Sequence, residues 1–379
     1  MRVYLDNSAT TEVYPEAAEA AVRLMRECYG NPSSLHGAGL DAERELKSAR
    51  KTVASLAFGC RDNEVYFTSC GTEGDNTAIF GAWQSHRREG NEIVTTAVEH
   101  PAVLEAMRRL EEEGAKVTYV GVDKECRVDP EEVAAAVTDK TILISVMTVN
   151  NETGTVMPIR KIADRKGKAI LHTDAVQALG KTDLSGLGAD LITVSGHKIH
   201  APKGVGAIYV KKGTKLRPYL YGGGQESGFR SGTENTPGIA AFAAAVRKGY
   251  EEKDAQHARM RAARERLLAG ILDQIPNVKV NSPADGSPSV LNVSFLGTRG
   301  EVILHRLEQE NIYVSTGSAC SAGKKGGSHV LKAMGLTPEE VTGAIRFSFG
   351  AFNTPEEMDY VIDKLAEAVA SFRRLGSFR

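Results

Sequence analysis

The chain has 379 residues, of which 41% are apolar and 25% charged, a composition typical of a globular protein with room for one large and one smaller domain. Its formal net charge of -1 argues against a general nucleic-acid or membrane-surface role, because both need a basic excess. No apolar run reaches membrane-spanning length and the N-terminus does not resemble a signal peptide, so we expect a cytoplasmic protein.

Helix and strand patterns alternate through the first two-thirds of the chain. Helices are expected over residues 15–28, 36–57, 101–113 and 130–137, and another helix is expected to follow the polar turn 68–73 and to run through Trp83. Strands are expected over residues 64–68, 92–95, 116–122, 141–146, 171–174, 189–194 and 205–210. This alternation predicts an α/β fold with a mainly parallel sheet covered by helices, and ligands in such sheets bind at the carboxyl ends of the strands.

The last third predicts a second, smaller α+β domain. Residues 236–275 are expected to form a long helical region that leads to it. Strands are then expected over 278–280, 290–295, 312–314 and 345–348, with helices over 300–310 and from 355 to about 372.

Lys198 and Asp174 each follow a predicted strand. A lysine flanked by Ser195 and His197 at a buried strand end is poorly placed as a solvated charge, but well placed to form a Schiff base with an aldehyde cofactor. An aspartate at a neighbouring strand end would protonate a pyridine nitrogen. The pair therefore indicates pyridoxal phosphate.

Three further turns at strand ends carry polar residues. The turn before Thr72 opens a helix, so it is either a phosphate site or a simple helix cap. His100 is either a turn histidine or a side chain that stacks on a flat cofactor. Asn151 lies in a polar turn closed by Gly154, which is compatible with binding.

Two other segments leave alternatives open. Residues 222–235 are rich in glycine and form either a flexible loop or a loop that approaches a phosphate or a partner subunit. Arg346 lies in an apolar strand, where a charge needs a partner. A substrate carboxylate and an internal Asp or Glu are equally suitable partners.

The chain has five cysteines and no CxxC pair, so we expect neither a metal site nor a disulfide framework. Cys320 stands apart because it lies among small residues with Lys324 and Lys325 nearby. Nearby cations favour the thiolate, so Cys320 is the candidate nucleophile. The remaining four are read as small buried residues.

Taken together, these motifs resemble the cysteine desulfurases, pyridoxal-phosphate enzymes of the aminotransferase class V family. The resemblance runs nearly end to end and rests on ten motifs in order: Tyr4-Leu-Asp-Asn-Ser-Ala-Thr-Thr, Gly30-Asn-Pro-Ser-Ser-Leu-His, Thr68-Ser-Cys-Gly-Thr-Glu, Glu99-His, Asn150-Asn-Glu-Thr-Gly, Thr173-Asp-Ala-Val-Gln, Ser195-Gly-His-Lys, Arg230-Ser-Gly-Thr, Gly317-Ser-Ala-Cys and Ile345-Arg-Phe-Ser. Residues 320–329 resemble the group with the longer, mobile cysteine loop.

The resemblance implies a fold-type I architecture with a seven-stranded sheet. The large domain would span residues 13–250, and the small domain residues 1–12 and 251–379. It also implies a role for each matching residue. The cofactor would be held by Gly71, Thr72, His100, Asn151, Asp174, Gln177, Ser195, His197, Lys198 and, from the second subunit of a homodimer, Thr233. The substrate carboxylate would be bound by Asn151 and Arg346, and the catalytic residues would be Cys320, Lys198 and His100.

The implied reaction converts L-cysteine to L-alanine and a persulfide on Cys320. The sulfur would pass to an acceptor such as an iron–sulfur scaffold or a tRNA-thiolation enzyme. A selenocysteine lyase or another class V aminotransferase is the alternative, although an aminotransferase has no use for Cys320. Cys70 replaces a small residue of the family's phosphate turn, and we interpret it as a packing residue.

Overall fold

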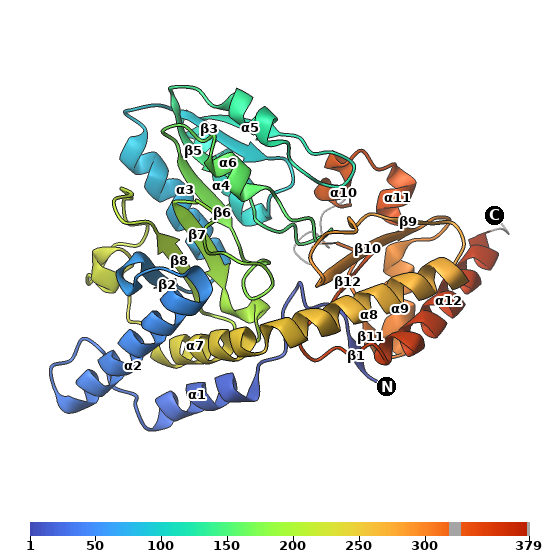
Figure 1. The fold of residues 1–379 in the computed structure, drawn as a ribbon, viewed down its shortest axis with the longest axis horizontal. Helices are drawn as coiled ribbons and strands as arrows, with labels where there is room; N and C mark the ends of the chain where they lie inside the picture. Colours follow the sequence, from blue (N-terminus) through green and yellow to red (C-terminus); the bar gives the residue numbers. More distant parts are fainter. Residues whose placement is uncertain (318–326, 377–379) are drawn as a thin grey trace.

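A seven-stranded sheet forms the centre of the larger part of the molecule (Figure 1). The computed structural model describes residues 1–317 and 327–376. The strand order is β2 (Val65–Thr68), β8 (Gly206–Val210), β7 (Leu191–Ser195), β6 (Ile170–Asp174), β5 (Thr141–Ser145), β3 (Glu92–Thr96) and β4 (Lys116–Val120). Strand β8 runs antiparallel to both of its neighbours, β2 and β7, and every other adjacent pair in the sheet is parallel. The predicted mainly parallel α/β sheet is confirmed.

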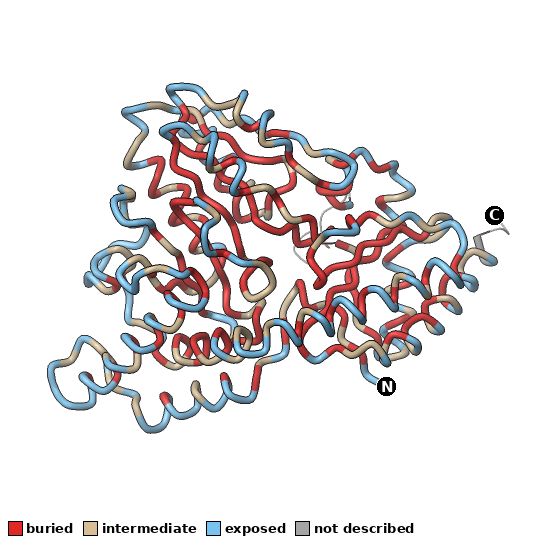
Figure 2. The backbone as a smooth tube through the Cα atoms, viewed as in Figure 1, coloured by how far each residue is buried: buried red, intermediate tan, exposed pale blue. Residues whose placement is uncertain are grey.

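Helices cover both faces of this sheet, so its central strands are buried throughout (Figure 2). One face packs against α3 (Gly71–His86) and α4 (Pro101–Glu112) through residues such as Ile93 and Leu143. The opposite face uses the next residues, Val94 and Ile144. It packs against α2 (Gly37–Val53), α5 (Pro130–Ala136), α6 (Ile159–Ala163) and α7 (Thr236–Glu251).

A second core lies in the smaller part of the molecule. There β9 (Val278–Val280), β10 (Val290–Phe295) and β12 (Ala344–Ser348) form an antiparallel sheet. Its core is completed by α8 (Lys253–Gln274), α9 (Gly300–Gln309) and α12 (Glu357–Gly376). The N-terminal strand β1 (Val3–Tyr4) pairs with β11 (Ile312–Tyr313), so the two ends of the sequence share one core.

Several element boundaries differ from those predicted. The helical region 236–275 is two helices, because the backbone leaves helical geometry at Glu252. Helix α2 ends at Val53, and a π-helical turn, Ala54–Phe58, follows it directly. The five-residue helices α6, α10 (His329–Ala333) and α11 (Pro338–Thr342) were not predicted, because such short helices show too little periodicity.

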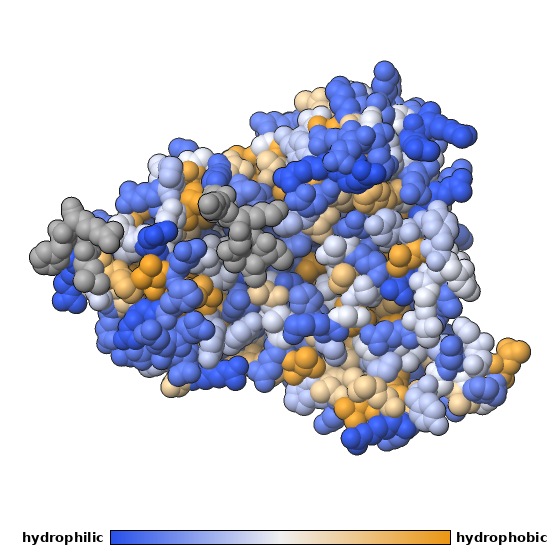
Figure 3. Space-filling view, turned by 180° about the vertical axis from the view of Figure 1, so that it is seen from behind, coloured by the Kyte–Doolittle hydropathy of each residue, from blue (hydrophilic) through white to orange (hydrophobic). Residues whose placement is uncertain are grey.

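The face seen in Figure 3 is largely hydrophilic, with apolar side chains gathered where α1 (Pro15–Arg26) and α2 lie. Exposed apolar residues of this region are Val22, Met25, Tyr29, Leu35 and Leu40. Among the described residues, no helix combines the length and apolar character needed to span a bilayer.

Candidate active site

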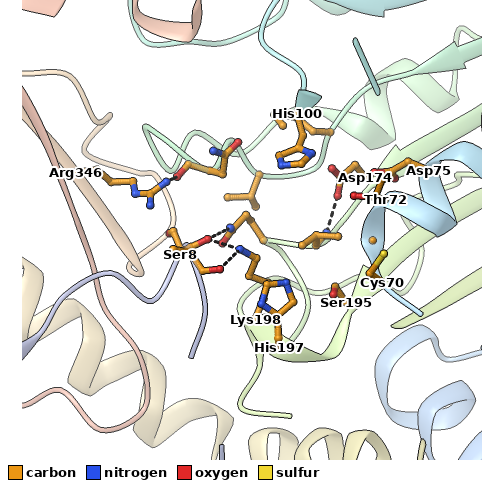
Figure 4. A pocket seen from close by; sticks show the side chains of 17 residues that line it. Ser8, Cys70, Thr72, Asp75, His100, Asp174, Ser195, His197, Lys198 and Arg346 are labelled. Carbon is orange, nitrogen blue, oxygen red and sulfur yellow. Dashed lines mark hydrogen bonds between the residues drawn. The ribbon is translucent and has the colours of Figure 1, made fainter. Parts of the chain in front are cut away.

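A cavity of about 220 Å³ opens at the carboxyl ends of the parallel strands (Figure 4). Ten of the residues predicted from the sequence line it: Gly71, Thr72, His100, Asn151, Asp174, Gln177, Ser195, His197, Lys198 and Arg346. Sequence reasoning missed Ser8, Ala9, Asp75, Met147, Val149 and Val176, which also line it.

Lys198 lies in the 3-10 turn Gly196–Lys198 that follows β7. Its Nζ donates hydrogen bonds to the carbonyl oxygens of Ser8, at 2.5 Å, and Ala9, at 2.7 Å. The N-terminal segment therefore holds the amine at the cavity wall.

Asp174 ends β6, and its Oδ1 accepts a hydrogen bond from the N–H of Val176 at 2.9 Å. Burial and the neighbouring Asp75 raise the pKa of Asp174 to about 7. Asp75 is 1% exposed, and burial raises its pKa to about 8. One signal in the sequence could have identified Asp75 as a site residue: it lies among the uncharged residues Gly74, Thr77 and Ala78. A carboxyl group buried on such a helix face is costly unless it has a partner or a function.

His100 is both a helix cap and a cavity residue. Its Nδ1 accepts a hydrogen bond from the N–H of Ala102 at 3.1 Å, so the ring proton of the neutral form is on Nε2. Burial lowers the pKa of His100 below its ordinary value of 6.5, which favours the neutral ring. Figure 4 shows His100 and Lys198 on opposite sides of the cavity.

The N-terminus of α3 provides a place for an anion. The first N–H groups of a helix have no partner within the helix, and Gly71 begins this one. A Cβ at position 71 would lie 2.7 Å from Cγ2 of Val176, so glycine keeps the backbone accessible. Cys70, which precedes it, also lines the cavity and is partly exposed, so its thiol contacts this space as well as its neighbours.

Buried polar atoms without a hydrogen-bond partner surround the cavity. Within the described part of the chain these are Ser8 Oγ, Asp75 Oδ1, Gln177 Oε1, Ser195 Oγ and Arg346 Nε. Burial without a partner is costly for such atoms. The cavity therefore fits a polar ligand that offers several hydrogen bonds.

Arg346 and Asn151 connect the cavity to the smaller part of the molecule. Arg346 is 1% exposed, and its Nη2 lies 2.8 Å from Oδ1 of Asp6. Its Nη1 donates to the carbonyl oxygen of Asn151 at 3.1 Å. An internal acid, one of the two alternatives that the sequence left open, is thus present. Nε of Arg346 has no partner among the described residues, so the guanidinium can bind a further group.

Two predicted residues are not in this cavity. Thr233 is exposed and does not line it in its own chain. Cys320 lies outside the described residues. Within residues 1–317 and 327–376, no group of three His, Cys, Asp or Glu side chains is arranged to hold a metal ion.

Comparisons with known proteins agree with this arrangement. The model of the family "Aminotransferase class-V" matches residues 3–361. A Clostridium botulinum protein named "Cysteine desulfurase IscS" is 42% identical, over 99% of this chain and 96% of the relative. A "Cysteine desulfurase" of Trichormus azollae is 44% identical, over 100% and 95%.

Solved structures show the same similarity. A "NIFS-LIKE PROTEIN" superposes with a TM-score of 0.92 at 39% identity, over 98% of this chain and 100% of the other. "SspA in complex with cysteine" gives 0.82 at 31% identity, over 93% and 100%. The chain therefore belongs to the aminotransferase class V family.

Proposed function

We propose that the chain is a cysteine desulfurase, which converts L-cysteine to L-alanine and leaves a persulfide on Cys320. The observation that carries the proposal is the cavity itself, which gathers Lys198, Asp174 and His100 from three different strand ends with Arg346 beside them. The similarity to relatives named cysteine desulfurase supports the same reaction.

We propose pyridoxal phosphate as the cofactor, because the cavity residues fit it. Lys198 would hold its aldehyde, Asp174 its pyridine nitrogen and Gln177 its phenolic oxygen, while His100 would stack on the ring. Its phosphate would be bound by Gly71, Thr72, Ser195, His197 and the partner subunit's Thr233. When bound, this group supplies an electron sink for the substrate carbon atoms.

Arg346 and Asn151 would bind the substrate carboxylate. Arg346 offers Nε, and a guanidinium can form two parallel hydrogen bonds with a carboxylate. Asp6 already pairs with Nη2, so the guanidinium is held in place before the substrate arrives. This arrangement orients the substrate with little further loss of side-chain freedom.

The remaining steps use this chain's own acid–base and nucleophilic groups. His100 would transfer protons at Nε2, since Nδ1 is engaged by the N–H of Ala102. The Cys320 thiolate would attack the substrate sulfur. The sulfur–carbon bond then breaks with its electron pair left on carbon, which takes up a proton to give the methyl group of alanine.

We further propose a cytoplasmic homodimer that passes sulfur to an iron–sulfur scaffold or a tRNA-thiolation enzyme. Exposed apolar side chains on and after α1 support a subunit interface. The position of Thr233, which does not line the cavity of its own chain, supports one as well. The two cores support a division into residues 13–250 and residues 1–12 with 251–379, although Val330 and Leu331 join the larger core.

The test measures bound-cofactor absorbance, alanine production and persulfide in three purified proteins loaded with pyridoxal phosphate. Wild type should show all three. Lys198→Ala should lose the cofactor absorbance and alanine production. Cys320→Ala should keep the absorbance but lose more than about a hundredfold in alanine production, because the nucleophile is gone.

Cys28→Ala is the matched control, since this cysteine lies just beyond α1 and not in the cavity, and its turnover should equal that of wild type. A Cys320→Ala protein with wild-type turnover would contradict the assignment. Amino-group transfer to a keto acid without persulfide formation would favour an aminotransferase. A strong preference for selenocysteine over cysteine would favour a selenocysteine lyase.

A further inference from the structure

The turn at residues 150–154 contacts two strands of the smaller part of the molecule. Nδ2 of Asn292, on β10, donates to the carbonyl oxygen of Glu152 at 3.1 Å. Nη1 of Arg346, on β12, donates to the carbonyl oxygen of Asn151 at 3.1 Å. The turn therefore contains the cavity residue Asn151 and also contacts β10 and β12, which lie more than a hundred residues further along the chain.

The Glu152 side chain lies near the chain on both sides of segment 318–326, at Ser328 and at Gly317. It is 0% exposed, and its Oε2 accepts a hydrogen bond from Oγ of Ser328 at 2.5 Å. A Cβ at Gly317 would lie 3.3 Å from the same Oε2. One carboxylate oxygen therefore lies against both ends of the segment that contains Cys320.

Further bonds fix each end to the scaffold. Before the segment, Ser315 exchanges backbone hydrogen bonds with Arg346 at 3.1 and 2.7 Å, and its Oγ donates to the carbonyl oxygen of Gly317. After the segment, Oγ of Ser328 accepts from the N–H of Leu331 and caps α10. The Glu152 carboxylate bonds to the second end through Ser328 and lies beside the first end at Gly317.

A buried carboxylate is a costly way to fill this position. Oε1 of Glu152 is buried without a hydrogen-bond partner among the described residues. The hydrogen bond that Oε2 accepts from the Ser328 hydroxyl offsets part of this cost.

We propose that Glu152 is a positioning residue that holds the two ends of segment 318–326 beside Asn151 and Arg346. The two chain ends that flank the nucleophile are then fixed in position relative to the substrate-binding groups. This inference rests on the proposed function and concerns the sulfur-transfer step, not cofactor binding.

The experiment compares cofactor-loaded Glu152→Ala, Glu152→Gln, Ser328→Ala and the Glu152→Ala/Ser328→Ala double variant with wild type. Cofactor absorbance and cysteine affinity should stay within about twofold. Single-turnover persulfide formation should fall about tenfold or more in Glu152→Ala, since small displacements of a reacting group are costly. Glu152→Gln should recover most of the rate, because its amide oxygen can still accept from Ser328.

The double variant should be no slower than Glu152→Ala, because both substitutions remove the same hydrogen bond. Asn292→Ala is the matched control, since it removes a contact to the Glu152 carbonyl but leaves the carboxylate in place. Its persulfide formation should stay within about threefold of wild type.

Hydrogen exchange supplies a readout independent of turnover. Amides of residues 315–317 and 327–331 should exchange faster in Glu152→Ala, while those of β5 and β6 keep their wild-type rates. Unchanged exchange, or a single-turnover rate within twofold of wild type, would overturn the proposal. So would an equal loss in Asn292→Ala or a parallel loss of cofactor and cysteine binding. A wild type that forms no persulfide would instead refute the proposed function, while the exchange measurement would still test Glu152.

Discussion

Asp75, on α3, lines the cavity, and burial raises its pKa to about 8, so its carboxyl group is largely protonated near neutral pH. Its Oδ1 is 3.5 Å from Nε2 of His172, whose pKa burial lowers to about 4, so this histidine is neutral. His172 in turn lies 3.0 Å from Oγ1 of Thr193. Burial is the main cause that raises the pKa of Asp174, and negative charge on Asp75 would raise it further.

Replacing Asp75 with asparagine should change how stability depends on pH. The folded chain holds a proton on Asp75 between the ordinary pKa of 3.8 and about 8, whereas the unfolded chain does not. The folded state therefore binds more protons in this window, and the free energy of unfolding falls as pH rises through it. Asp75→Asn removes this contribution.

Denaturant unfolding of the cofactor-free proteins at pH 6 and pH 8 measures the effect. The comparison cancels the other buried titrating groups that the two proteins share. Asp75→Asn should lose less stability than wild type between the two pH values. Equal losses would show that Asp75 is ionised in the folded chain throughout this range.

At the scale of elements, the glycine-rich segment 222–235 is fixed at two points. Arg230 donates to Glu73 of α3 at 2.6 and 3.1 Å. Glu226, 1% exposed, accepts from Arg50 of α2 at 2.6 and 2.7 Å and from the N–H of Phe67 at 2.8 Å. Of the two alternatives for this segment, a freely flexible loop is therefore wrong.

The Arg50–Glu226 pair should contribute strongly to stability. Arg50→Leu leaves the Glu226 carboxylate buried without its cation, which should cost about 3 kcal/mol in the free energy of unfolding. Urea unfolding measures this value. Arg44→Leu on the same helix is the matched control, because its pair with Asp41 is 76% and 61% exposed. The control should change by less than about 1 kcal/mol. Equal effects of the two substitutions would contradict the role given to the buried pair.

At the scale of the whole molecule, the position of Thr233 determines whether one chain can complete its own site. It is exposed, and it does not line the cavity of its own chain. If it serves the second subunit's cavity, each active site needs residues from two chains.

Crossed dimers test this assignment. Thr233→Ala alone should weaken cofactor binding, and Lys198→Ala alone should abolish turnover. In a mixed dimer of the two variants, one site combines an intact Lys198 with the partner subunit's Thr233. That site should bind cofactor as tightly as wild type, at half the number of sites per dimer. Weak binding in the mixed dimer would place Thr233 in its own chain's site.

The sequence by itself determined the strands and longer helices and placed the polar residues at strand ends. Alternating and helical periodicities are local, and burial of β5, β6 and β7 requires the apolar runs that the sequence shows. Because parallel strands share one carboxyl edge, Thr72, His100, Asn151, Asp174 and Lys198 were predicted to meet, and they line one cavity.

Only the tertiary structure decided which distant groups complete that cavity. Ser8 contacts Lys198 across 190 positions, and Asp6 pairs with Arg346 across 340. Such contacts depend on how β1 joins the C-terminal core, which no local pattern encodes. The same holds for Glu152. From the sequence it is one residue of a polar turn, and only the tertiary structure places its side chain next to Gly317 and Ser328. Periodicity predicts elements, whereas the protonation and partners of buried side chains are set by packing between them.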